Sequence, residues 1–397
     1  MIQTNTLATS KELFFNAEQA ITHALQTGYP IAVWRHPNET KVSAIIDLKS
    51  QFLKDLDELE FSDPGFLINP FDQHHPSIPK HVRADLIYSW DPAENNHAEY
   101  HISPQLSATE LETFMSKDPV KDKAQREDVV SSYETDFEEI VRRAIEELKA
   151  GTFSKVVLSR TKDIDLPEDF DLYKFFEKAC KAYQNAFCYL TYTPEYGLWM
   201  GATPEALLSI DDSGQFQTMS LAGTQRLDDR SLQEIAWTQK EIEEQAMVSR
   251  YIIDCFKKIR LREFSEVGPR TSRAGNLVHL KTTYSVDMKK VGMEKLGSTM
   301  MQLLHPTSAV CGMPLLDALS FIKQEEKYNR ELYAGFLGPV NVNQESRLYV
   351  NLRCMKIVSN RKARLFAGAG ITEDSDPHKE FLETEMKINT LKKLFDR

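Results

Sequence analysis

The sequence has few of the features that mark secreted, membrane-bound or metal-ribbon proteins. It contains only five cysteines in 397 residues, and none of them forms a C-x-x-C pair. Neither a disulfide framework nor a zinc ribbon is therefore indicated. No uncharged apolar stretch approaches the roughly 20 residues of a membrane span, and the first residues lack the basic and apolar parts of a signal peptide. We expect a cytoplasmic protein that has no membrane partner.

An excess of positive charge is also missing. The chain has 48 Lys and Arg against 59 Asp and Glu, which gives a formal net charge of −11. Nucleic acids and anionic membrane surfaces are bound by clustered basic residues, so we expect no nucleic-acid partner. Hydrophobic residues make up 41% of the chain, with 16 Gly and 17 Pro, a composition typical of a folded globular protein. The length suffices for one large core or two ordinary ones.

Hydrophobic periodicity predicts strands and helices that do not alternate regularly. Short β-branched runs predict strands, and a 3.6-residue period predicts helices, one of which ends at Gly151. The predicted strands cover 31–34, 42–46, 155–160, 188–193, 206–210, 348–358 and 364–367, and the long helices cover 231–259 and 376–395. Asp376 is the expected N-cap of the last helix and Pro377 its first residue. This order predicts an α+β fold.

The motifs described below all lie in the second part of the chain. Residues 1–128 are polar and hold no motif that we can name, and a charged stretch ends them. We interpret 1–128 as the N-terminal part of the same globule and 129–397 as the domain that carries the chemistry.

Two carboxylates of the predicted helix 231–259 face its apolar side. On a helical wheel, Glu241 and Glu244 fall in the stripe that contains Ile252 and Cys255. Ionised carboxylates among core residues are costly unless a positive charge meets them. An ion pair within the helix between Glu244 and Lys240 is one explanation, and a bound cation is another.

The last helix repeats this arrangement. Glu380, Glu383 and Lys387 lie beside the apolar stripe of Phe381 and Ile388. Two helices that each present a Glu-x-x-Glu pair inward could share one hard cation, and oxygen ligands suit Mg²⁺ better than zinc or iron.

Ordered blocks of sequence continue to the C-terminus. They are Lys155-Val-Val-Leu-Ser-Arg160, Gly201-Ala-Thr-Pro-Glu205, Leu221-Ala-Gly-Thr224, Lys240-Glu-x-x-Glu244, Val278-His-Leu280, His305-Pro-Thr-x-Ala309-Val310, Arg330-x-x-Tyr333-x-Gly335, Asn351-Leu-Arg353, Gly368-Ala-Gly-Ile371 and Ser375-x-Pro377-x-x-Glu380-Phe-x-Glu383. In this order they resemble the chorismate-utilising enzymes, which include isochorismate, salicylate, anthranilate and aminodeoxychorismate synthases. The resemblance covers about 130–397 and rests on the shared order, since each block alone is short.

The resemblance implies a fold of packed antiparallel sheets flanked by helices, and one Mg²⁺ ion in the active site. In the family the second glutamate of each pair ligates the metal, so this role falls to Glu244 and Glu383. Glu241 and Glu380 would act through water molecules. The metal would hold a carboxylate of chorismate, so a protein of negative net charge can bind a dianion locally.

The resemblance also implies a substrate pocket. The residues that would bind chorismate are Ala222, Gly223, Thr224, His279, Ala309, Tyr333, Arg353, Gly368, Ala369, Gly370 and Lys387. We expect the Gly368-Ala-Gly370 segment to be a turn whose backbone N–H groups approach the substrate, because glycine lacks the Cβ that would block it.

The implied reaction converts chorismate to isochorismate: water attacks C2 while the C4 hydroxyl leaves. Lys155 would be the general base, and Glu205 would protonate the leaving oxygen, which requires burial to raise its pKa. Taken alone, Lys155 could be an ordinary edge-strand lysine and Glu205 a surface carboxylate after a proline.

Choosing among family members depends on few residues. A lysine at position 155 favours water over ammonia, so no glutaminase subunit is expected and a monomer suffices. Ala309, where salicylate synthases tend to have threonine, favours a reaction that stops at isochorismate. Salicylate formation with loss of pyruvate, and a catalytically silent chorismate-binding module, remain the alternatives.

Overall fold

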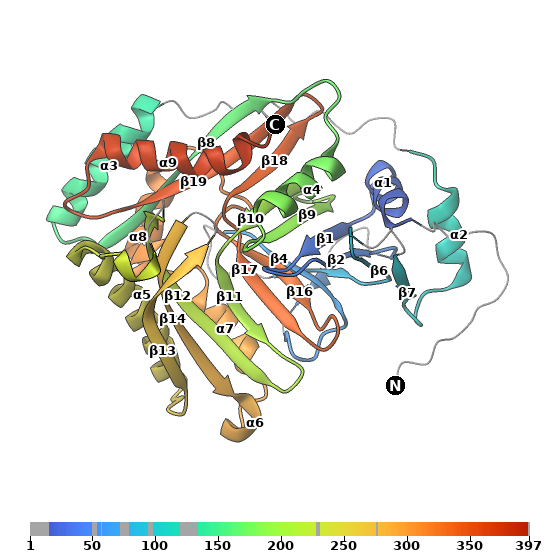
Figure 1. The fold of residues 1–397 in the computed structure, drawn as a ribbon, viewed down its shortest axis with the longest axis horizontal. Helices are drawn as coiled ribbons and strands as arrows, with labels where there is room; N and C mark the ends of the chain where they lie inside the picture. Colours follow the sequence, from blue (N-terminus) through green and yellow to red (C-terminus); the bar gives the residue numbers. More distant parts are fainter. Residues whose placement is uncertain are drawn as a thin grey trace.

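Two antiparallel sheets pack against each other, and helices cover them (Figure 1). The computed structural model describes residues 16–49, 54–56, 58–71, 79–93, 98–119, 134–227, 231–274 and 277–395. Within these residues every strand pair is antiparallel. The α+β prediction is confirmed.

The first sheet has ten strands among the described residues. In spatial order they are β15 (Gly312–Met313), β8 (Lys155–Asp165), β19 (Lys362–Ile371), β18 (Cys354–Ser359), β10 (Gly197–Thr203), β9 (Phe187–Thr193), β1 (Ile31–Arg35), β2 (Val42–Ile46), β6 (Leu86–Trp90) and β7 (Glu99–Ile102).

The second sheet has nine strands in the same part of the chain. In spatial order they are β13 (Ser265–Ala274), β14 (Leu277–Asp287), β12 (Gln215–Arg226), β11 (Ala206–Ile210), β17 (Ser346–Val350), β16 (Phe336–Val340), β4 (Gly65–Asn69), β5 (Lys80–Arg83) and β3 (Lys54–Asp55). Residues before 128 thus supply strands to both sheets. The boundary at 128 lies outside the described residues and stays a prediction.

Two apolar cores follow from the alternation of side chains along the strands. Ala32 and Trp34 of β1 face the core between the sheets, where the Trp34 ring lies 5.5 Å from that of Phe66 on β4. Ile31 and Val33 of the same strand face a second core on the outer side of the ten-stranded sheet. Because both faces of this strand are covered, its run is apolar throughout.

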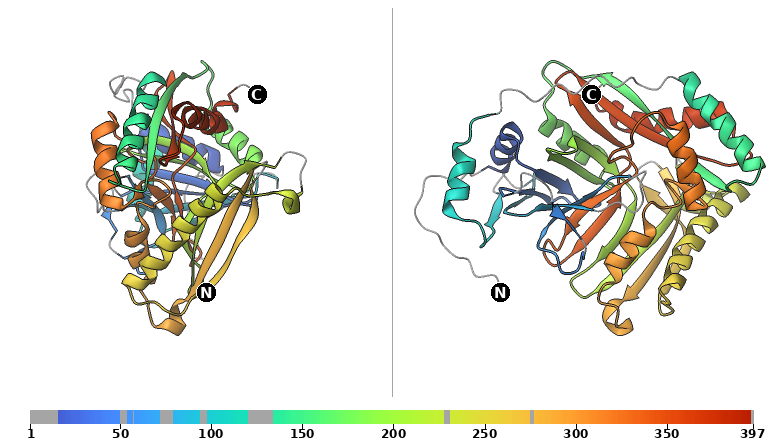
Figure 2. Two further views of the ribbon diagram at one scale, coloured as in Figure 1. Left: turned by 90° about the vertical axis from the view of Figure 1, so that its left-hand side faces the viewer. Right: turned by 180° about the vertical axis from the view of Figure 1, so that it is seen from behind.

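The helices divide between these two cores. They are α1 (Ala17–Thr27), α2 (Ala108–Ser116), α3 (Glu134–Lys149), α4 (Leu172–Ala182), α5 (Gln239–Lys258), α6 (Met288–Val291), α7 (Leu296–Leu304), α8 (Leu315–Glu325) and α9 (Pro377–Lys392), with a 3₁₀ turn at Leu232–Glu234. Residues of α1, α2 and α4 enter the outer core, those of α3, α5, α6, α7 and α8 enter the core between the sheets, and α9 contributes to both. Figure 2 shows α3 and α9 side by side at one end of the ten-stranded sheet. No described helix is both long and apolar enough to cross a membrane.

The ends of two predicted helices are confirmed. Asp376 caps α9 by accepting a hydrogen bond from the Lys379 backbone N–H (2.9 Å), and Pro377 is the first residue of that helix. Gly151 follows the end of α3 with φ of 81°. A positive φ of this kind is easiest for glycine.

The predicted start of the helix at residue 231 is wrong, since α5 begins at Gln239. Thr238 is the N-cap, and it forms a capping box with Glu241: the Thr238 N–H donates to Glu241 Oε2 (2.7 Å), and the Glu241 N–H donates to Thr238 Oγ1 (3.4 Å). The box satisfies two backbone donors at this point, so the helix starts there. The signal, a threonine three residues before a glutamate, is present in the sequence.

The single strand predicted at 348–358 is also wrong, because the chain breaks between β17 and β18. Asn351 is buried, accepts a hydrogen bond from Tyr189 Oη (2.7 Å) and donates one to the Leu332 carbonyl (2.8 Å). Arg353 then has φ of 50°, which a strand does not permit. These contacts turn the chain from one sheet to the other.

Candidate active site

The chain passes from one sheet to the other at two neighbouring places. Glu205 lies between β10 of the ten-stranded sheet and β11 of the nine-stranded sheet, and 351–353 lead from β17 back to β18. The Val350 N–H donates to the Glu205 carbonyl (2.9 Å), and the Ala202 N–H donates to the Arg353 carbonyl (3.1 Å). The two crossings are therefore held together, and they bring a carboxylate and a guanidinium to the junction of the sheets.

Lys155, the first residue of β8, is buried beside Glu244 of α5. Its side chain is 4% exposed, and its Nζ lies 2.9 Å from Glu244 Oε1. A Cβ at position 370 would lie only 3.0 Å from Lys155 Cε, so Gly370 leaves the room that this lysine uses. The pair joins the strand to the helix. The sequence offered Lys240 of the same helix or a bound cation as the partner of Glu244. The observed partner is instead a lysine from another element, and the Lys240 side chain lies outside the described part.

Glu241 is occupied at the N-terminus of α5. Besides the cap of Thr238, its two carboxylate oxygens accept hydrogen bonds from Gln225 Nε2 at 3.1 and 2.9 Å. Gln225 comes from β12, so Glu241 ties the start of the helix to the nine-stranded sheet.

The glutamates of α9 differ in their exposure. Glu380 is 6% exposed, and its Oε1 accepts a hydrogen bond from Ser375 Oγ (2.8 Å). Glu383 is partly exposed and pairs with Lys387 one turn later, at 2.6 Å. Lys387 Nζ also donates to the Gly368 carbonyl (2.8 Å), which attaches this helix to β19.

The segment 368–370 is part of strand β19, and the predicted turn is wrong. Gly368 and Gly370 share one face of the strand, which runs to Ile371, while Ala369 is fully buried on the other face. β18 pairs with β19 only at 362–365, because β18 begins only after the crossing at 351–353. The edge of β19 at the glycines thus has no strand beside it on that side among the described residues, and its backbone groups face the junction.

Burial and three cations determine the protonation of Glu205. Burial raises its pKa to about 7, against the lowering influence of Lys155, Lys387 and Arg353 in that order. Each of these cations is thus near enough to act on the Glu205 carboxylate. The structure brings together the predicted base, the predicted acid and two predicted substrate-binding residues.

The predicted residues of β12 and β14 lie at the edge of this junction. The register of the two strands shifts between Ala222 and Gln225, and Gly223 within this bulge has φ of 67°. His279 Nδ1 lies 3.0 Å from the Gly223 carbonyl, so Nδ1 carries the proton. Burial lowers the pKa of His279, and Arg353 and Lys387 lower it further, which keeps the imidazole neutral at pH 7. The side chain of Thr224 lies outside the described part.

Tyr333 belongs to the same junction. Its hydroxyl would lie 2.8 Å from a Cβ at position 368, and its ring stacks on Phe366 of β19. Ala309 is connected less directly: it lies in the turn before Cys311, whose carbonyl accepts a hydrogen bond from the Val157 N–H of β8 (2.8 Å).

Sequence reasoning missed a buried ion pair that supports β8. The side chains of Arg330 and Glu326 are both 0% exposed, and Arg330 Nη2 lies 2.6 Å from Glu326 Oε1. Arg330 donates to the Val157 carbonyl (2.7 Å), and Glu326 Oε1 accepts from the Ser159 N–H (2.7 Å). Arg330 was part of a sequence block, but a glutamate four residues before it gives no signal of its own. The pair fixes the strand that carries Lys155.

The four glutamates provide a donor set that fits Mg²⁺, since all their ligand atoms are carboxylate oxygens. Two of them already hold a positive charge, Glu244 through Lys155 and Glu383 through Lys387. Within the described residues no three acids, histidines or cysteines are close enough together to hold a metal. In the structure Glu244 and Glu383 are thus each held by a lysine.

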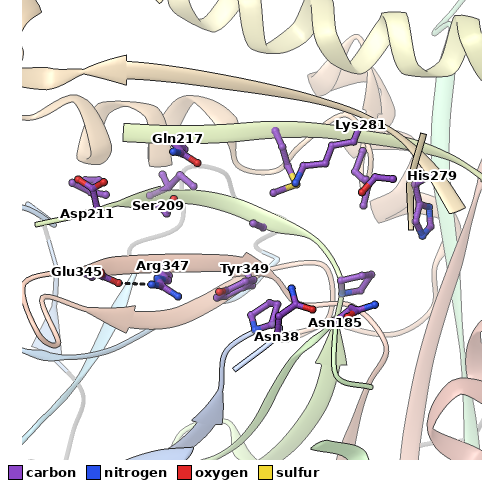
Figure 3. Close-up of a pocket in the computed structure, with 18 of the residues that line it drawn as sticks. Asn38, Asn185, Ser209, Asp211, Gln217, His279, Lys281, Glu345, Arg347 and Tyr349 are labelled. Atoms are coloured by element: carbon purple, nitrogen blue, oxygen red, sulfur yellow. Dashed lines mark hydrogen bonds and ion pairs between the residues drawn. The ribbon is translucent and has the colours of Figure 1, made fainter. Parts of the chain in front are cut away.

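A groove of about 610 Å³ begins at this junction and runs along the nine-stranded sheet (Figure 3). His279 and Pro204, which precedes Glu205, line one end, and Asp211 and Glu345 line the other. Its remaining lining is mainly polar, so a small hydrophilic molecule fits it better than an apolar one.

Comparison with known proteins identifies the family to which this arrangement is similar. The family described as chorismate binding enzyme matches residues 86–396. The isochorismate synthase EntC of Escherichia coli is 30% identical over 270 residues, which cover 66% of this chain and 67% of that protein. The salicylate biosynthesis isochorismate synthase of Pseudomonas aeruginosa is 30% identical over 267 residues, covering 64% of this chain and 54% of that protein.

Solved structures show a similar fold over nearly the whole chain. The menaquinone-specific isochorismate synthase MenF of Escherichia coli superposes with a TM-score of 0.74 at 21% identity, covering 96% of this chain and 92% of that one. Anthranilate synthase component I of Streptococcus pneumoniae gives a TM-score of 0.62 at 16% identity, covering 99% and 95%. The expected fold of packed antiparallel sheets flanked by helices is confirmed.

Proposed function

The chain belongs to the chorismate-binding enzymes, and from this premise we propose that it is an isochorismate synthase, an isomerase that interconverts chorismate and isochorismate. The observation that carries the proposal is the junction of the sheets, where a buried lysine, a carboxyl group of raised pKa and two further cations meet. The named relatives support it independently.

The proposed reaction needs two proton transfers. A water molecule adds to C2 of the ring and loses a proton, the double bonds shift, and the C4 oxygen leaves as water after it gains a proton. Water is consumed and released in equal amounts, so no oxidant or reductant is needed. A base and an acid must therefore face the ring at the same time.

Lys155 is the proposed base. It starts a strand that the Arg330–Glu326 pair holds, and its side chain is nearly inaccessible to solvent. In the structure its ammonium group donates to Glu244, and it would act as the base only after giving up that proton, as the free amine that takes the proton of the attacking water. Positioning of this kind is a large part of the catalytic effect of a bound base.

Glu205 is the proposed acid. A pKa of about 7 leaves roughly half of the carboxyl groups protonated at neutral pH, whereas an ordinary glutamic acid at a pKa of 4.5 would be almost fully ionised. The neighbouring cations act in the opposite direction, so the burial of Glu205 is what keeps a proton available for the leaving oxygen.

Arg353, Lys387 and the backbone of 368–370 are the proposed binding groups for the two carboxylates of chorismate. The guanidinium and ammonium supply charge-assisted hydrogen bonds, and the glycines let the substrate approach the free edge of β19. Tyr333, Ala222, Gly223, Thr224, Ala309, Ala369 and His279 remain proposed members of the pocket wall, Ala369 through its backbone only.

Mg²⁺ is the proposed cofactor, with Glu244 and Glu383 as its direct ligands and Glu241 and Glu380 acting through water. When bound, it would neutralise and orient a substrate carboxylate. The residues of the chain then hold the ring between Lys155 and Glu205. We further propose a cytoplasmic monomer without a glutaminase subunit.

Product analysis tests the proposal. The purified protein is incubated with chorismate and Mg²⁺, or with chorismate and a chelator, and the products are separated and identified by their molecular mass. We expect isochorismate with Mg²⁺ and none with the chelator. Salicylate with pyruvate would make the protein a salicylate synthase, and binding without any turnover would make it a silent module.

A further inference from the structure

In the groove beside the junction, the cation Lys281 has no counter-charge among the described residues. Lys281 of β14 points into the groove between His279 and the paired Glu345 and Arg347 (Figure 3). Its side chain is partly buried. Among the described residues, no carboxylate forms an ion pair with it; its cross-strand neighbour on β13 is Arg270, also a cation.

Arg347, another cation that lines the groove, has its counter-charges in place. Arg347 pairs with Glu345 and Glu39 at 2.6 and 2.7 Å. Lys281 by contrast has lost part of its hydration and gains no attraction in return: burial lowers its pKa, and Arg270 lowers it further. A half-buried ammonium of this kind is energetically costly.

An anion in the groove would remove this cost. Lys281 lies two residues before Thr283 and two after His279 on the same strand face, so about 7 Å separate it from His279 along the strand. Beyond His279 the next cations are Arg353 and Lys387. The groove therefore places Lys281 on the way to the two cations that we propose as binding groups for the substrate.

We propose that this groove is the path by which the substrate reaches the junction, and that Lys281 is an anion-binding position within it that attracts small dicarboxylates. The inference rests on the proposed function, because it takes the ligand to be chorismate. Lys281 acts before the chemical step, so it affects the rate of association and leaves the reaction at saturation unchanged.

The test compares association rates by stopped-flow fluorescence. Lys281→Met is made in a Lys155→Ala background, so that chorismate binds without being consumed, and Trp237, which lies against Gly223, provides the signal. At low salt we expect association about 5- to 10-fold slower than in the background protein, with dissociation within about twofold. In about 0.5 M salt the difference should fall below twofold, because salt screens the attraction.

Lys323→Met on the outer helix α8 removes an equal charge from an exposed position and should change association by less than about twofold. Lys281→Arg keeps the charge and should restore the rate, which separates the proposal from a folding defect. Equal association rates for Lys281→Met and its background, or a loss that salt does not affect, would overturn the proposal.

The two proposals fail in different ways. If the wild-type protein converts chorismate but Lys281→Met associates with it at the background rate, only the groove proposal is wrong. If the wild-type protein neither binds nor converts chorismate, the proposed function is wrong, and so is the groove proposal.

Discussion

The glutamate pairs of α5 and α9 have the same spacing in sequence, yet the structure holds them differently. Glu380 of α9 is buried and bonded to a serine just before its own helix, whereas Glu241 of α5 caps the helix and bonds to β12. Of the second glutamates, Glu383 pairs within its helix and Glu244 pairs with Lys155 of β8. Glu244 thus connects α5 with the strand that carries the proposed base.

Equal spacing of the two glutamates in each helix therefore does not give them equal roles. A glutamate whose lysine comes from its own helix can lose that lysine without moving another element. A glutamate that pairs with a lysine of a strand couples its helix to that strand, so a displacement of the glutamate also displaces the lysine. We expect the α5 side to govern the chemistry and the α9 side to govern ligand binding.

The largest expected effect is on the two lysines. Lys155→Met should lower kcat by at least about 10³-fold with chorismate binding retained, because it removes the proposed base. Lys387→Met should chiefly raise KM, by about 10-fold, because it removes a binding charge. Steady-state kinetics with product separation measures both.

Lys162→Met provides the control for these variants. Lys162 lies on the same strand β8 but pairs with Glu385 away from the junction, at 2.8 Å, and its loss should leave kcat within about twofold. If Lys155→Met turned over at the wild-type rate, the base assignment would be wrong.

Glu205→Gln should lower kcat by about 10²- to 10³-fold, because glutamine cannot supply the proton that the leaving oxygen needs. In the proposed mechanism the active form of Glu205 is the protonated carboxyl, so the kcat of the wild type should fall as the pH rises through about 7. If kcat of Glu205→Gln still falls as the pH rises through about 7, the group that titrates is not Glu205.

Metal affinity compares the two glutamate pairs directly. Glu244→Gln and Glu383→Gln should each weaken Mg²⁺ binding by about 10-fold or more in calorimetry, since each removes a proposed direct ligand. Glu243→Gln, an exposed neighbour on α5, should leave the affinity within about twofold. Unchanged affinity in both ligand variants would exclude the proposed metal site.

The stability of the protein should also report the burial of Glu205. Its folded pKa of about 7 lies above its ordinary value of 4.5, so between these values the folded state binds more protons than the unfolded state. Stability from this group is therefore present below about pH 4.5 and is lost as the pH rises through 7. Glu205→Gln removes the effect, and its Tm relative to the wild type should rise between pH 5 and pH 8. A constant difference in Tm would contradict the raised pKa.

The smallest expected effects concern the helix caps. Thr238→Ala and Asp376→Ala should each lower the free energy of unfolding by about 1 kcal/mol in denaturant titrations, because each removes a capping hydrogen bond. The two variants should differ in their affinity for Mg²⁺. Only Thr238→Ala also removes a contact of Glu241, so only this variant should shift Mg²⁺ affinity. Equal shifts in both would argue against the difference between the pairs.

Local sequence signals predicted much of this fold. The cap and the first residue of α9 follow from Asp376 and Pro377, and the strands at 42–46 and 206–210 have the predicted bounds. The inward direction of Glu380 follows from its wheel position, because the 3.6-residue period depends on the helix alone.

Contacts between distant segments could not be predicted in this way. The break at 351–353 depends on hydrogen bonds of Asn351 with Tyr189 and Leu332, and the glycines of β19 look like a turn until β8 is placed beside them. The partner of Glu244 lies 89 residues away, so no helical wheel could name it. The start of α5 is different, because its capping box was visible in the sequence.

Water labelled with ¹⁸O tests the central claim most directly. The protein is incubated with chorismate and Mg²⁺ in H₂¹⁸O, and the isochorismate is analysed by mass spectrometry early in the reaction. The account predicts that each isochorismate molecule carries one ¹⁸O atom, at C2, because the new hydroxyl comes from solvent water. Unlabelled isochorismate, with the original hydroxyl moved within the ring, would contradict it.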